Sequence, residues 1–510
     1  MNDKIIITNK TALSQKYGKE GLTKINKALK DVLKADANRG IKTSVIYLDD
    51  EAAMKKLGGV AVTTASSPKQ NKDAIDAIAK AASPDYLMIL GAPDVVPHQD
   101  LINPAFDPGN DDDANAEGDL PYACDVPYSR DPAKFVGPAR VVGRLPDLAG
   151  ASDPAHLISL LAVAAGYQSR PAQNYAKYFG LSAHVWKGST TLSLENVFGN
   201  ATSLLTSPTA GPSYPQGEMK ALTHFINCHG GEADPQFYGQ KGSSYPPSVT
   251  TKDAAGQIKE GTVAAAECCY GGELYDSETL GIDMPICQSY LRQGAYGFFG
   301  STTIAYGPAD SNGSADYICQ DFLIQVLGGA SLGRAALIAR QHFVERNSQM
   351  DPFDLKTLAQ FCLLGDPSVQ PVAAAGDTKV AKGTTDASAE RFARAERRVK
   401  LKQMGEFLSQ TKPTASKKVR TGRVTPTTKA ALANIAKKAG IGDAKPFSAF
   451  AVRNKAPKQK RGGKSEAVPS RYFINVWKPK KTHDGLHLGV GVVAKELNGR
   501  IVDYRIYYQR

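Results

Sequence analysis

The sequence predicts an α/β fold with a doubly wound, mainly parallel sheet. Three short runs of apolar and β-branched residues, at 5–8, 43–48 and 86–90, predict strands near the start of the chain. Between the first two runs, apolar residues recur every three or four positions across 22–33, the period of a helix that buries one face. Strands that alternate with helices build parallel sheets covered by helices on both faces.

The alternation of strands and helices continues to about residue 372. Further strands are predicted at 139–142, 224–227, 263–266 and 297–300, and further helices at 154–167 and 331–343. A chain of 510 residues is long enough for two or three domains. We therefore expect an N-terminal α/β subdomain at 1–150 and a second subdomain of the same class at 151–372.

The residues after 372 change in composition. Residues 373–385 are rich in Ala, Gly, Thr and Lys, which is typical of a linker, and 373–468 is expected to hold basic linkers and two helices, at 387–408 and 425–440. A small β element is predicted at 469–510, with strands at 471–477, 486–494 and 501–508. Asn498-Gly499 predicts a hairpin turn between the last two strands.

Charge is divided unevenly between these regions. Residues 1–370 carry 31 Lys+Arg against 40 Asp+Glu, a net of −9, whereas residues 371–510 carry 31 against 10, a net of +21; the two sum to +12. The basic character therefore belongs to the C-terminal region alone. A field of this strength attracts acidic proteins or nucleic acid.

The start of the chain and its cysteines indicate a compartment. Met1-Asn2-Asp3-Lys4 precedes only a short apolar run, without the apolar core of a signal peptide, and no stretch approaches the length of a membrane span. Seven cysteines, an odd number that includes an adjacent pair, favour reduced thiols over a disulfide framework. We expect a cytoplasmic protein that does not bind membranes.

Two predicted strands end in residues that can do chemistry. The strand at 224–227 is followed by Cys228-His229-Gly230, and the strand at 263–266 by Glu267-Cys268-Cys269. In an open α/β sheet the loops at the carboxyl ends of strands carry the binding and catalytic residues. Successive side chains on a strand point to opposite faces, so only one of Cys268 and Cys269 faces a cleft. A thiol and an imidazole at neighbouring strand ends predict a cysteine hydrolase.

The two strand ends resemble the caspase clan of cysteine peptidases, in which His-Gly follows one strand and an acidic or amide residue, a small residue and the nucleophilic Cys follow the next. Four further segments, in family order, narrow the resemblance to gingipain-like cysteine peptidases: 85–91, 119–123, 142–146 and 363–367. The resemblance covers residues 1–372. It implies a caspase-like arrangement of the two subdomains, with 151–372 as the catalytic one, and a protein or peptide substrate.

The resemblance also implies roles for individual residues. Cys269 is the expected nucleophile and His229 the expected proton donor, while the backbone N–H groups of Gly230 and Cys269 would hold the oxyanion. Ser301, Thr302 and Tyr306, from the strand after the nucleophile, would line the substrate pocket. Related enzymes steady the histidine with a carboxylate, but residues 181–186 contain no acid. Because residues 187–196 offer only Glu195, we expect a P1 preference that is not strictly basic.

Metal and cofactor hypotheses remain beside this one. One hypothesis is a zinc site, since thiolates and imidazole are the usual zinc ligands; the four candidates are Cys228, His229, Cys268 and Cys269. Neighbouring residues of a strand point to opposite faces, however, so the four side chains do not readily surround one ion. The loop at 107–119, with Asp111, Asp112 and Asp113, could hold calcium, which gingipain-like enzymes bind, but it lacks the spacing of an EF-hand. A solvated acidic loop is the simpler interpretation. The expected chemistry needs no cofactor.

Two other functions stay open. The first is an inactive caspase-like scaffold whose basic tail binds nucleic acid or an acidic partner; an intact His/Cys pair counts against it. The second is a regulated defence or cell-death protease acting on one cytosolic target. For the tail itself we expect a separable module from about residue 373, dispensable for chemistry, in which five basic residues contact phosphates or acidic peptides: Lys455, Lys458, Lys460, Arg461 and Lys464.

Overall fold

The computed structural model describes residues 2–373, 387–422, 424–441, 447–453, 470–477, 486 and 488–510. Its main element is a ten-stranded sheet. In spatial order its strands are β2 (Thr43–Tyr47), β1 (Lys4–Thr8), β3 (Tyr86–Leu90), β4 (Val142–Leu145), β14 (Phe361–Gly365), β12 (Gly297–Ser301), β11 (Val263–Ala266), β7 (Thr223–Asn227), β5 (Tyr178–Ala183) and β6 (Leu204–Ser207).

The pairing within this sheet is mainly parallel. The strands β1 to β4 run parallel to one another, as do β5, β6, β7, β11 and β12, whereas β14 runs antiparallel to β12. The predicted α/β class with a mainly parallel sheet is therefore confirmed. Strands from both sides of the expected boundary near residue 150 lie in this one sheet.

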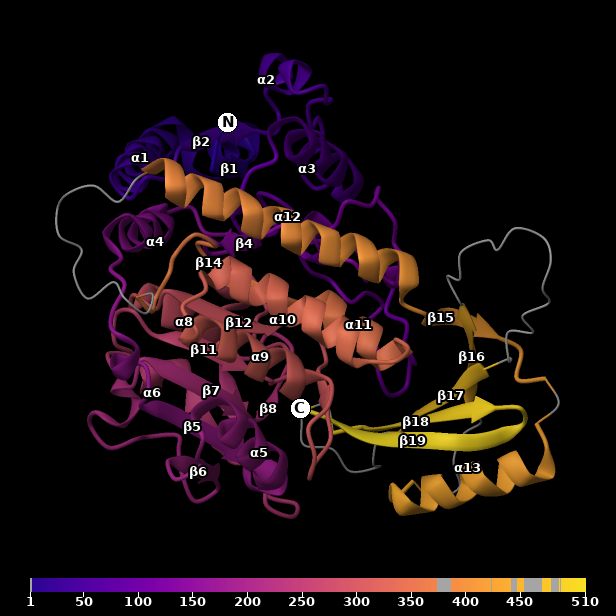
Figure 1. The fold of residues 1–510 in the computed structure, drawn as a ribbon. Helices are drawn as coiled ribbons and strands as arrows, with labels where there is room; N and C mark the ends of the chain where they lie inside the picture. Colours follow the sequence, from indigo (N-terminus) through magenta and orange to yellow (C-terminus); the bar gives the residue numbers. More distant parts are fainter. Residues whose placement is uncertain are drawn as a thin grey trace, which may run out of the picture.

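Helices cover both faces of the sheet (Figure 1). They are α1 (Lys10–Asn38), α2 (Glu51–Lys56), α3 (Pro68–Ala82), α4 (Ala155–Gly166), α5 (Lys187–Phe198), α6 (Thr251–Ala254), α7 (Ser277–Leu280), α8 (Ile286–Arg292), α9 (Ala315–Leu327), α10 (Leu332–Arg346), α11 (Pro352–Gln360), α12 (Ala387–Thr411) and α13 (Pro426–Lys438). On one face α9 packs between α5 and α10, and on the other α4 lies between α1 and α8. Among the described residues, none of these helices is both long and apolar enough to cross a membrane.

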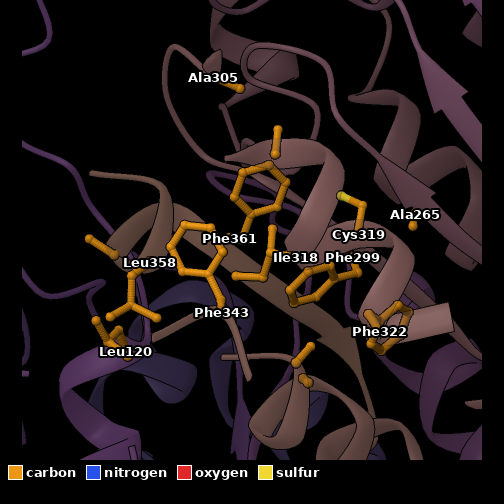
Figure 2. Packing of buried hydrophobic residues seen from close by; sticks show 14 of the residues in the cluster. Leu120, Ala265, Phe299, Ala305, Ile318, Cys319, Phe322, Phe343, Leu358 and Phe361 are labelled. Atoms are coloured by element: carbon orange, nitrogen blue, oxygen red, sulfur yellow. The ribbon is translucent and has the colours of Figure 1, made fainter. Parts of the chain in front are cut away.

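The core follows the alternation of side chains along the strands. Phe225, Ala265 and Phe299 face a cluster completed by α9, α10 and α11, part of which Figure 2 shows. Their neighbours Ile226 and Phe298 face a second cluster with α1, α4 and α8. Because neighbouring residues of a strand point to opposite faces, a strand buried on both faces must be apolar throughout. That is why these strands are visible in the sequence.

The strand predicted at 139–142 is displaced. In the structure β4 begins at Val142 and continues through Arg144, which is fully buried and donates two hydrogen bonds to the carboxylate of Asp119. A charged residue in the middle of a buried strand breaks the apolar pattern on which the prediction rests. The pattern therefore predicts this strand, but three residues too early in the chain.

Five strands of the C-terminal region and β13 form a second sheet of six antiparallel strands. In order they are β13 (Tyr306–Gly307), β19 (Arg500–Gln509), β18 (Val490–Leu497), β17 (Ser470–Trp477), β16 (Ser448–Arg453) and β15 (Thr414–Val419). The turn at Asn498-Gly499 has φ of 50° and 75°, the left-handed conformation that a tight hairpin turn requires, as predicted. The strands β15 and β16 fall in the region where only linkers and helices were expected.

The expectation of a separable C-terminal module does not agree with the packing. Leu408 of α12, Phe450 of β16 and Tyr507 of β19 belong to the same hydrophobic cluster as the main sheet. In addition, Arg398 of α12 pairs with Asp85 at 2.7 Å. Removing everything after residue 376 would expose part of the main core to water. The basic stretch from Lys455 to Lys464 lies outside the described residues.

Candidate active site

The ends of β7 and β11 lie side by side. The two strands are parallel, with Ile226 opposite Ala266, and His229 and Cys269 each follow that pair by three residues. The two chain segments touch beyond the strands, because a Cβ added to Gly230 would collide with the carbonyl oxygen of Cys269. The structure thus brings together the three residues for which the sequence predicted catalytic roles.

Cys268 and Cys269 face opposite sides of the sheet. Cys268 packs with Ile226 and Ala266, whereas Cys269 packs with Phe225 and Ala265. The Sγ atom of Cys269 accepts a hydrogen bond from the backbone N–H of Ala305 at 3.3 Å. Cys228 shares the cluster of Cys268, so the four candidate zinc ligands are divided between the two faces of the sheet.

His229 is held by an amide. It lies in the short strand β8 (His229–Gly230), which pairs with β9 (Gln236–Tyr238) in a small sheet completed by β10 (Pro247–Thr250). This hairpin brings Gln240 to His229, where the Oε1 atom lies 2.8 Å from Nε2. Nε2 then carries the proton, which leaves the Nδ1 lone pair open; within the described part of the chain Nδ1 has no hydrogen-bond partner.

An oxygen atom occupies the predicted oxyanion position. The carbonyl oxygen of Arg510 accepts hydrogen bonds from the N–H groups of Cys269 at 3.2 Å and Gly230 at 3.4 Å. Arg510 follows β19, whose end lies beside β8 (Figure 1). The two N–H groups therefore converge on one point next to the thiol-bearing residue, which is the arrangement that stabilises an acyl-transfer transition state.

The side chain of Arg510 is fully buried in a pocket beside these groups. Its Nη2 atom donates to the carbonyl of Pro308 at 2.8 Å and lies 3.3 Å from the Asp316 carboxylate. Its Cζ atom lies 4.5 Å from the ring centre of Trp186, which in turn contacts His229 with the ring centres 4.3 Å apart. A Cβ on Gly307 would collide with the guanidinium, so glycine at this position leaves room for the Arg510 side chain.

Two buried carboxylates face this guanidinium. Asp316 lies in the first turn of α9, and the Oε2 atom of Glu267 lies 3.9 Å from Nη2 of Arg510. Burial and the neighbouring Asp316 carboxylate raise the pKa of Glu267 well above its usual range. We infer that Glu267 is protonated, which leaves one negative charge opposite one guanidinium. A buried charge pair of this kind discriminates strongly against uncharged side chains.

Two of the three predicted pocket residues lie in strands, Ser301 at the end of β12 and Tyr306 in β13, and Thr302 follows β12 directly. The Ser301 hydroxyl donates to the carbonyl of Thr303, and the Thr302 hydroxyl donates to the backbone carbonyls of Glu117 and Gln360. The Tyr306 hydroxyl contacts Gln509, one residue before the arginine. The acid absent from residues 187–196 is supplied instead by Asp316, more than a hundred positions later. The carboxylate beside the Arg510 guanidinium therefore comes from α9 and not from residues 187–196.

The acidic loop at 107–119 is neutralised from within the protein. The Nζ atom of Lys356 lies 2.8 Å from Asp111 and 2.9 Å from Asp113, and all three side chains are largely or fully buried. Burial alone would lower the pKa of Lys356, but the two carboxylates raise it above the usual value. An ammonium group therefore stands between the carboxylates expected to bind calcium, while Asp112 remains exposed.

One set of side chains in the described residues has the spacing of metal ligands, namely His98, Asp119 and Cys362. Asp119 already forms a buried ion pair with Arg144 at 2.6 Å, which supplies the positive charge that a carboxylate in this position needs. Burial and Arg144 lower the pKa of His98 to about 4. The set is therefore explained as a structural ion pair.

Burial keeps the candidate thiol and the candidate imidazole uncharged in this state. It raises the pKa of the Cys269 thiol to about 12. It also lowers the pKa of His229 to about 3; the hydrogen bond with Gln240 opposes this shift, and the positive charge of Arg510 adds to it. Since the thiolate is the reactive form, the occupied cleft is not primed for attack. Opening the cleft to water would relax both shifts.

Comparison with known proteins gives little. No family model matches the chain, and no curated protein matches it. One solved structure, titled "Structure of Protease", is similar with a TM-score of 0.46 and 14% sequence identity, covering 99% of this chain and 96% of that one.

Proposed function

We propose that this protein is a gingipain-like cysteine endopeptidase of the caspase clan that cleaves polypeptides after arginine. The observation that carries the proposal is the convergence of the Cys269 and Gly230 N–H groups on one carbonyl oxygen, next to a thiol and an imidazole. A mere scaffold would have no use for these four groups in one place. The sequence resemblance points to the same residues.

The reaction follows from the positions of these groups. His229 takes the proton of the Cys269 thiol as Sγ attacks the scissile carbonyl carbon. The two N–H groups hold the resulting oxyanion, each contributing about 3–4 kcal/mol by comparison with similar sites. The C–N bond breaks as His229 protonates the departing amine, which leaves a thioester. Water hydrolyses the thioester and restores the thiol. Gln240 acts as a positioning residue, since it fixes the tautomer and the orientation of His229.

The P1 preference follows from the pocket around Arg510. Asp316→Asn removes the charge that faces the guanidinium, so kcat/KM for substrates with arginine at P1 is expected to fall roughly 30-fold or more. Substrates with glutamine at P1 should lose much less, because they gain nothing from the charge. Profiling a peptide library by mass spectrometry measures both.

Asp310→Asn is the matched control, because Asp310 lies on the same segment but is exposed. Its arginine preference should equal that of the unmodified protein. An unchanged preference in Asp316→Asn, or a library profile in which arginine is not enriched at P1, would refute the assignment of this pocket.

A further inference from the structure

The last residues of the sequence lie in the cleft as a peptide substrate would. Tyr306 of β13 pairs with Gln509 in antiparallel register, and the N–H of Arg510 donates to the carbonyl of Ala305 at 3.1 Å. Adding a strand to a free edge in this way is a common means of binding extended peptides. The register places Arg510 at P1, with its carbonyl oxygen on the two N–H groups and its side chain in the acidic pocket.

We propose that β19 is a tethered inhibitor of the protein's own active site, and that peptide hydrolysis requires Arg510 to leave the cleft. This inference rests on the proposed function, since it concerns the regulation of that same site. With β19 in place Cys269 is fully buried and His229 is 2% exposed, so no other peptide can reach them. A substrate must displace Arg510 before it binds.

The tether makes this competition effective. The strand β19 pairs with β18 along its whole length, from Leu497 opposite Arg500 to Val490 opposite Tyr508. The end of the strand therefore stays beside the cleft even when Arg510 has left it. A tethered ligand of this kind acts at a local concentration in roughly the millimolar range, which a dilute substrate cannot match.

The contacts of Arg510 at the end of the strand are weaker than those of Gln509 before it. The Nε and Nη1 atoms of Arg510 are buried and have no hydrogen-bond partner among the described residues, which weakens the contact. Gln509, in contrast, is bonded to the N–H of Gly489, the carbonyl of Asn110 and the hydroxyl of Tyr306. Release is therefore expected to begin at Arg510, while the rest of the strand keeps its place.

Arg510→Ala tests the proposal in the 510-residue chain. The change removes the guanidinium from the pocket and leaves the hairpin intact. We expect kcat/KM for a fluorogenic peptide with arginine at P1 to rise at least tenfold. The rate at which iodoacetamide modifies Cys269, measured by peptide mass spectrometry, should rise by a similar factor; all seven cysteines are buried, so the starting rate is low.

Arg500→Ala is the matched control, an exposed arginine at the other end of the same strand, and both of its rates should equal those of the unmodified chain. If Arg510→Ala speeds modification of Cys269 but no variant cleaves peptides, the inhibitor contact stands and the proposed function falls. If Cys269-dependent cleavage is present and both rates of Arg510→Ala stay within twofold of the unmodified chain, the function stands and the inhibitor proposal is overturned.

Discussion

Cys269→Ala is expected to lower kcat/KM for peptides with arginine at P1 by roughly a thousandfold or more, because the nucleophile is lost. The variant should be measured in the full chain and together with Arg510→Ala, so that a closed cleft does not hide the effect. Its unfolding free energy should change little, since alanine replaces a small buried side chain at the same face of the sheet.

Cys268→Ser provides the contrast, because Cys268 packs on the opposite face of the sheet. We expect it to keep most of the activity. The opposite pattern, with Cys268 essential and Cys269 dispensable, would mean that the register after β11 is off by one residue. Full activity in both variants would end the cysteine peptidase proposal.

Lys356→Met is expected to cost about 3–5 kcal/mol of unfolding free energy at pH 7, because it leaves the carboxylates of Asp111 and Asp113 buried without a positive partner. The pair would then have to take up protons on folding. The difference in unfolding free energy between the variant and the unmodified protein should therefore narrow as the pH falls toward 4, because both carboxylates are protonated more readily there. Urea unfolding at several pH values measures it.

Lys69→Met is the control for this change. Lys69 pairs with Asp73 on the exposed face of α3, and such surface pairs contribute about 0–1 kcal/mol. A loss of less than about 1 kcal/mol in Lys356→Met would show that the loop at 107–119 does not depend on the ammonium group. Calcium that fully restores Lys356→Met but does not bind the unmodified protein would show a site masked by the lysine.

The fold is readable from the sequence where strands are apolar on both faces. The strands β7 and β11 were predicted within one residue, because every position in them faces a core. The strand β4 was displaced by the buried Arg144, and β15 was missed because Lys417 and Lys418 break its apolar pattern. Charged side chains within a strand interrupt its apolar pattern, so the strand cannot be recognised from that pattern.

The site was predictable only where it is local in sequence. His229, Gly230 and Cys269 follow strand ends directly, so their approach follows from parallel pairing. Gln240 reaches the cleft through a hairpin, Asp316 through the start of a helix and Arg510 through the end of β19. No sequence motif marks any of these three residues. Trp186 offered a weak signal, as one of two tryptophans in the chain. The pocket therefore had to come from the fold.

The most direct test of the account fuses a short peptide after Arg510 of the 510-residue chain, so that Arg510 in the cleft precedes a peptide bond that Cys269 can cleave. Intact-mass spectrometry of the folded protein should show a chain that ends at Arg510, formed at a rate independent of protein concentration, while Cys269→Ala keeps the extension. Retention of the extension by the unmodified, folded protein would contradict the claim that Cys269 acts on a P1 arginine held in this cleft.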